Sequence, residues 1–71
     1  MRHETAARVV QLMLEFGQRL DEVVAILQQE CDTDEFNAYR RGVGRVMGAM
    51  LLDVMNPIFE EHPDLKPKDL D

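Results

Sequence analysis

The segment 42–56 reads GVGRVMGAMLLDVMN and constrains the fold more than any other part of the sequence. Its apolar residues have helical spacing, yet it contains Gly42, Gly44 and Gly48, and a glycine in a helix interior costs about 1 kcal/mol relative to alanine. We therefore expect another element to pack closely against this backbone. Apolar residues and glycines cover more than half of the helix circumference, which is more than one neighbouring helix covers.

A second amphipathic pattern occupies the first half of the chain and predicts a helix from about residue 5 to residue 30. Apolar residues recur there at alternating steps of three and four. They are Ala6, Val9, Met13, Phe16, Leu20, Val23 and Leu27. Flanking apolar positions make this stripe wider than a two-stranded coiled coil requires, which favours a bundle helix.

The apolar pattern loses its phase between Cys31 and Glu35, which predicts a turn. Asp32 followed by Glu35 resembles a capping box, with aspartate in the Ser/Thr position, and predicts a second helix over about 33–56. One continuous helix is the less favoured alternative, because no Gly or Pro interrupts the chain here. Pro57 stops or kinks the second helix, and a short extra turn is expected over 57–61.

The length of the chain predicts assembly. Seventy-one residues form one domain close to the size limit for a self-sufficient core. The single Cys31 excludes an intramolecular disulfide, and no Cys/His cluster with zinc spacing is present. The predicted fold is therefore all-α: an antiparallel helical hairpin over residues 1–61 that dimerises into a four-helix bundle. Residues 62–71 are expected to form an extended or mobile arm, with Leu65 and Leu70 as its only possible anchors.

The second helix is predicted to use two faces. The face around Phe36 is expected to contact the first helix, with Gly17 opposite Gly48. The other face is the predicted dimer or interaction surface. It consists of Gly44, Gly48, Leu51, Leu52, Met55 and Phe59.

The only basic cluster consists of Arg40, Arg41 and Arg45, and it predicts a nearby anionic group. The favoured partner is Asp21 or Glu22 across the hairpin, or an acidic residue of a second protomer. The alternative is a phosphate, a nucleic acid or an acidic protein surface. We expect this cluster to be the contact point for any anion or charged partner.

Catalytic and metal-binding patterns are weak. The chain has no serine, and Cys31 has no basic neighbour that would stabilise a thiolate. His3 and His62 are interpreted as separate surface histidines, and Asp21 and Asp53 as solvated acids. We predict no catalytic residue, no metal ligand and no cofactor, and therefore no enzyme.

Charge and hydropathy limit the partners. A net charge of −6 disfavours nucleic acid as a partner, and no apolar run approaches the roughly 18 residues that span a bilayer. The cytoplasm is the expected location. The predicted role is a homodimeric protein-interaction or regulatory module with an unidentified protein partner. A nucleic-acid-binding bundle that uses the arginine cluster and a small subunit of a larger enzyme complex are the alternatives.

Overall fold

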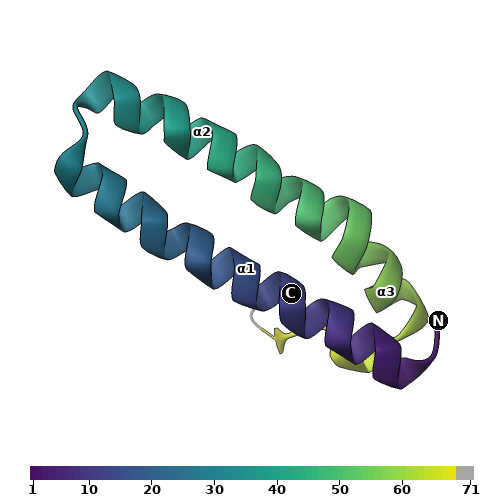
Figure 1. Ribbon diagram of the computed structural model, residues 1–71. Coiled ribbons are helices and arrows are strands. Elements are labelled where there is room, and N and C mark those ends of the chain that lie inside the picture. The colour runs from purple at the N-terminus through teal and green to yellow at the C-terminus, as the bar shows by residue number, and fades with distance from the viewer. Residues whose placement is uncertain (69–71) are drawn as a thin grey trace.

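The computed structural model describes residues 1–68 and shows an antiparallel helical hairpin (Figure 1). The all-α fold class is confirmed, and residues 1–68 contain no strand. The elements in chain order are α1 (His3–Glu30), α2 (Thr33–Ala49), the π-helix η1 (Met50–Met55), α3 (Asn56–Glu61) and the 3-10 helix η2 (Pro63–Leu65).

The hairpin turn lies at Cys31 and Asp32, where both residues adopt extended backbone conformations. The Asp32 Oδ1 atom accepts a hydrogen bond from the Glu35 backbone N–H at 2.8 Å. Asp32 is thus the N-cap of α2, as its spacing from Glu35 predicted, and the alternative of one continuous helix is wrong.

Asp32→Ala is expected to lower the free energy of unfolding by about 1 kcal/mol, because it removes the only side-chain cap of α2. Urea denaturation followed by circular dichroism measures this loss. Asp34→Ala is the matched control: it removes an acid from the same first turn but leaves the Asp32 cap in place. Equal losses in the two variants would contradict a specific capping role.

The π-helix η1 separates α2 from α3 and was not predicted. Its hydrogen bonds span five residues rather than four, as in the bond from the Asn56 N–H to the Leu51 carbonyl. Pro57 is the residue after Asn56. It has no N–H, and in an α-helix its ring would crowd the carbonyl group four residues earlier. A wider turn before Pro57 relieves this conflict. It also inserts one residue relative to α-helical spacing, which displaces later side chains by about 100° around the axis.

This displacement decides which residues face α1. Met55 and Phe59 take the angular positions that an unbroken α-helix would give to Val54 and Ile58. The sequence prediction placed Met55 and Phe59 on the outer interaction face, whereas in the single chain both residues lie in the core. They are only 7% and 6% exposed, because they turn inwards towards α1.

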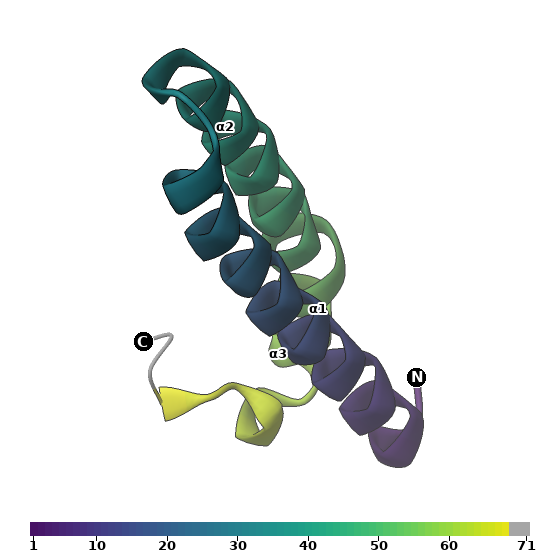
Figure 2. The same cartoon turned by 60° about the vertical axis from the view of Figure 1, so that its left-hand side comes forward.

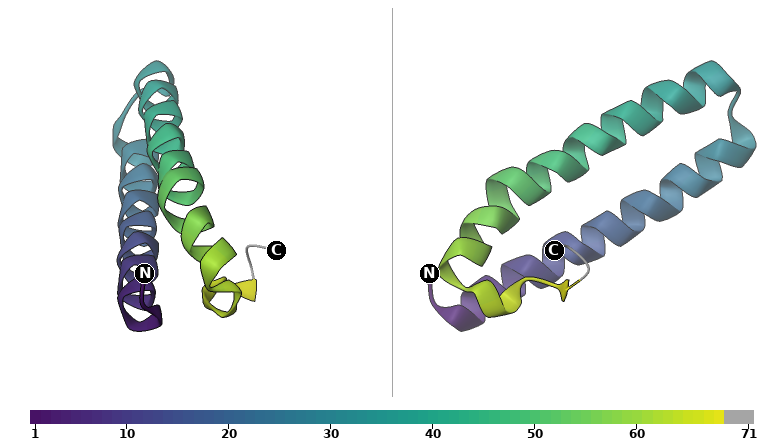
Figure 3. Two further views of the ribbon diagram at one scale, coloured as in Figure 1. Left: turned by 90° about the vertical axis from the view of Figure 1, so that its right-hand side faces the viewer. Right: turned by 180° about the vertical axis from the view of Figure 1, so that it is seen from behind.

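The core lies at the open end of the hairpin, where α1 begins and α3 follows η1 (Figure 3). It consists of Ala6, Val10, Met55, Ile58 and Phe59. None of the residues of α2 is buried. The half of the hairpin nearest the turn therefore has no core of its own within the described chain.

The segment after α3 turns back sharply beside the hairpin, as Figure 2 shows. Leu65 in η2, one of the two possible anchors expected from the sequence, packs against the core. Residues 69–71, including the proposed anchor Leu70, lie outside the described part of the chain.

The molecule is elongated, with extents of 45 × 19 × 16 Å. Among residues 1–68, no helix combines the length and the apolar content that a bilayer span requires.

Candidate interaction surface

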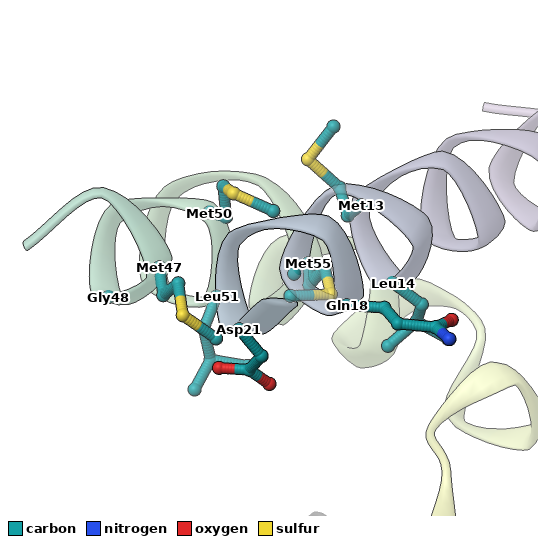
Figure 4. Close-up of a pocket in the computed structure, with 10 residues that line it drawn as sticks. Met13, Leu14, Gln18, Asp21, Met47, Gly48, Met50, Leu51 and Met55 are labelled. Carbon is teal, nitrogen blue, oxygen red and sulfur yellow. The ribbon is translucent and has the colours of Figure 1, made fainter. Parts of the chain in front are cut away.

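An apolar groove of about 500 Å³ lies between α1 on one side and α2 and η1 on the other (Figure 4). Its lining residues are mainly methionine, leucine and glycine. They are Met13, Leu14, Gly17, Gln18, Asp21, Met47, Gly48, Met50, Leu51 and Met55. The groove adjoins the core but extends towards the turn, into the part of the hairpin that has no buried residues.

The polar groups of the groove lie on the α1 side. Figure 4 shows the Gln18 amide and the Asp21 carboxylate extending from α1, whereas Met47 and Leu51 line the opposite side. Unbranched methionine side chains adapt to partners of different shapes. An apolar surface with a few polar groups on one side has the composition of a protein contact surface.

The glycines of α2 have no close neighbour from another element among residues 1–68. A Cβ atom built at Gly42, Gly44 or Gly48 would meet no atom within 4 Å. Only Gly17 of α1 is near another element, since its Cβ would lie 3.8 Å from the Met47 Cε atom. The close packing that the α2 glycines predict is thus not provided by α1.

The predicted interaction face divides into two sets. Gly44 is exposed, Leu52 is 64% exposed, and Gly48 and Leu51 are partly exposed where they line the groove. Phe59 instead belongs to the core, whereas Met55 belongs to the core and also lines the groove. We define the interaction surface as Gly44, Gly48, Leu51 and Leu52 together with the groove.

The arginine cluster has no acidic partner within the described chain. None of Arg40, Arg41 and Arg45 forms an ion pair in residues 1–68. The favoured cross-hairpin pairing with Asp21 or Glu22 is therefore wrong. The three guanidinium groups remain available to an anionic group outside this chain.

Two histidines and an aspartate lie close together at the open end of the hairpin. This cluster was not predicted from the sequence. His3 Nε2 lies 2.6 Å from Asp64 Oδ2, and His62 Nε2 donates a hydrogen bond to the Met1 carbonyl at 2.9 Å. The two imidazole rings form an edge-to-face pair with centroids 5.3 Å apart. The premise that these histidines are separate is wrong, because residues 62–65 fold back onto the start of α1.

Charged neighbours change the acidity of several groups. A hydrogen bond from His3 lowers the pKa of Asp64, and a hydrogen bond from the chain's terminal ammonium group lowers the pKa of Glu61. Both carboxyl groups are therefore ionised at neutral pH. Desolvation, followed by the nearby charges of Glu35 and Asp32, raises the pKa of Cys31, which disfavours a nucleophilic thiolate.

Comparisons with models of protein families, with curated proteins and with solved structures give no match to this chain. Its function is therefore inferred from the geometry of these surfaces.

Proposed function

We propose that this protein is a homodimeric interaction module, in which two hairpins pack groove to groove as a four-helix bundle. The observation that carries the proposal is the excess of exposed surface. The chain exposes 5583 Å². A compact monomer of 8.2 kDa is expected to expose about 4,500 Å², which is about 1,000 Å² less.

This excess has the size of a protein interface. A stable complex buries about 800 Å² on each partner. The radius of gyration supports the same conclusion, because it is 14.3 Å, whereas a compact domain of this length has about 11 Å. A second copy of the chain would cover the groove and produce a more compact particle.

Exposed apolar side chains near the turn support a partner that extends along the whole hairpin. Several large apolar residues of this part are about half exposed, although their helical spacing is that of a core stripe. They are Phe16, Val23, Ile26, Tyr39 and Val46. A second hairpin supplies matching helices of the same length, whereas a short peptide would cover only part of this surface.

The glycines and arginines fit the same partner. Gly44 and Gly48 lie one helical turn apart and have open space above them, so a second helix backbone can approach closely there. Arg41 and Arg45 belong to the same side of α2, and acids of a second copy would supply counter-charges that no acid of residues 1–68 supplies. The single thiol of Cys31 forms no intramolecular disulfide and suits the reducing cytoplasm, which we propose as the location.

Sedimentation equilibrium over micromolar to millimolar concentrations tests the proposal. We expect a particle of twice the 8.2 kDa chain mass that dissociates on dilution. A single species with the mass of one chain throughout this range would refute the homodimer. A higher oligomer would refute the four-helix bundle.

A further inference from the structure

We propose that His3, His62 and Asp64 form a binding site for a divalent transition-metal ion of the zinc type. Each of the three residues offers one ligand atom, and these atoms all lie within 4.8 Å of one another. Two imidazole nitrogens and one carboxylate oxygen are a ligand set that zinc accepts, with a further position left for water. The site lies at the open end of the hairpin and is separate from the proposed dimer groove.

The positions of the side chains suit metal binding. Zinc binds imidazole nitrogen and carboxylate oxygen at about 2.0–2.2 Å, so ligand atoms around one ion lie roughly 3.4 Å apart. The His3 Nε2 and Asp64 Oδ2 atoms, at 2.6 Å, must separate slightly, and no two of the three ligand atoms are more than 4.8 Å apart before an ion binds. His3 and Asp64 are exposed, so small rotations of these side chains do not disturb the core.

His62 is the least exposed of the three ligands. Its side chain is only 17% exposed, and its Nε2 atom donates a hydrogen bond to the Met1 carbonyl and lies 3.0 Å from Glu61 Oε1. This bond places the proton of neutral imidazole on Nε2 and leaves the Nδ1 lone pair free. A backbone carbonyl that holds one ring nitrogen is the usual second partner of a metal-binding histidine.

The chain positions of the ligands give the ion a structural effect. His3 belongs to the first turn of α1, whereas His62 and Asp64 belong to the segment around η2. An ion held by all three residues would link the two ends of the described chain beside the core. Binding to the folded state alone would stabilise the fold.

Titration of the untagged full chain with ZnCl₂, followed by isothermal calorimetry, tests this site. We expect one zinc ion per chain, and a melting temperature that rises by about 10 °C or more at a zinc concentration of about 100 times Kd. EDTA should reverse this rise. In NMR spectra, the side-chain signals of both histidines should shift with added zinc.

Three variants and one control locate the site. His3→Gln, His62→Gln and Asp64→Asn should each weaken zinc binding by about 100-fold or more, because losing even an outer partner of a ligand costs about 10–100-fold. Asp53→Asn makes the same charge change at an exposed position in η1 and should bind zinc normally. Absence of zinc binding to the wild-type chain, or undiminished binding by His62→Gln, would overturn the proposal. Neither result would affect the proposed dimer.

Discussion

Phe59→Ala is expected to remove most of the stability of this protein. Truncating a buried phenylalanine costs about 3–5 kcal/mol, and a single core in a chain of this size rarely supplies more than about 3–5 kcal/mol. Phe59 is one of five core residues and lies opposite Ala6 and Val10 of α1 in that cluster. Thermal and urea unfolding followed by circular dichroism at constant protein concentration should show this loss.

Leu52→Ala is the matched comparison for Phe59→Ala. The two residues are seven positions apart and would share one face of an unbroken α-helix. The π-helix η1 separates them, so that Phe59 is buried while Leu52 is exposed. Leu52→Ala should therefore change the stability of the hairpin by no more than about 0.5 kcal/mol when the protein is measured as a monomer. Similar losses in both variants would contradict the register that η1 imposes.

Gly48→Leu is expected to disrupt the dimer and leave the hairpin folded. In the single chain, a Cβ at Gly48 meets no atom within 4 Å, and leucine is a better helix former than glycine. In the dimer, the added side chain would occupy the space of the approaching helix. Overpacking costs about 1–3 kcal/mol at each of two symmetric sites, so the dimer Kd should rise about 30-fold or more. Sedimentation measures Kd, and circular dichroism measures helicity.

Gly42→Leu is the control for this substitution. It places the same leucine side chain on the same helix, and a Cβ at Gly42 also has open space around it. Gly42 lies six residues before Gly48 and therefore on a different side of the helix axis. Its dimer Kd should equal that of the wild type. A Gly48→Leu variant that associates as strongly as the wild type would contradict close helix approach at this glycine, whereas loss of helicity would contradict the open space beside it.

Local sequence patterns were sufficient to predict the hairpin. The loss of apolar phase after Cys31 and the spacing of Asp32 and Glu35 depend on residues that are neighbours in the chain. The structure confirms the turn, and its cap bond joins residues only three positions apart. The bounds of α1, His3–Glu30, are likewise close to the predicted range of about 5–30.

The register beyond Met50 was not predictable from the same patterns. A helical projection assigns about 100° to every residue, and one inserted residue is invisible to it. Pro57 was the available signal, and it was interpreted as a stop or kink rather than as the cause of a wider turn before it. The buried positions of Met55 and Phe59 were therefore not predicted, although both residues were correctly recognised as apolar helical positions.

Long-range contacts explain what was missed at the two candidate sites. His3 and Asp64 are 61 residues apart, so no spacing rule could place them together. Arg41 and Arg45 were expected to find an acid across the hairpin, but their orientation depends on how α2 is rotated about its axis. The helix-propensity cost of Gly44 and Gly48 predicted a close neighbour, but the described chain places none within 4 Å of a Cβ at either position, so that prediction rests on the proposed dimer.

The position of the core at the open end has a consequence for how the chain folds. A hairpin with its core beside the turn can close by local contacts, whereas here Ala6 must meet Phe59 before any buried cluster exists. Bringing these two residues together closes a loop of about 50 residues. Most of the chain entropy is lost in this closure before the core contacts form and offset the loss. Helices that form near Asp32 therefore do not by themselves bury a core, and the monomer is held closed by contacts between the start of α1 and the segment from Met55 to Phe59.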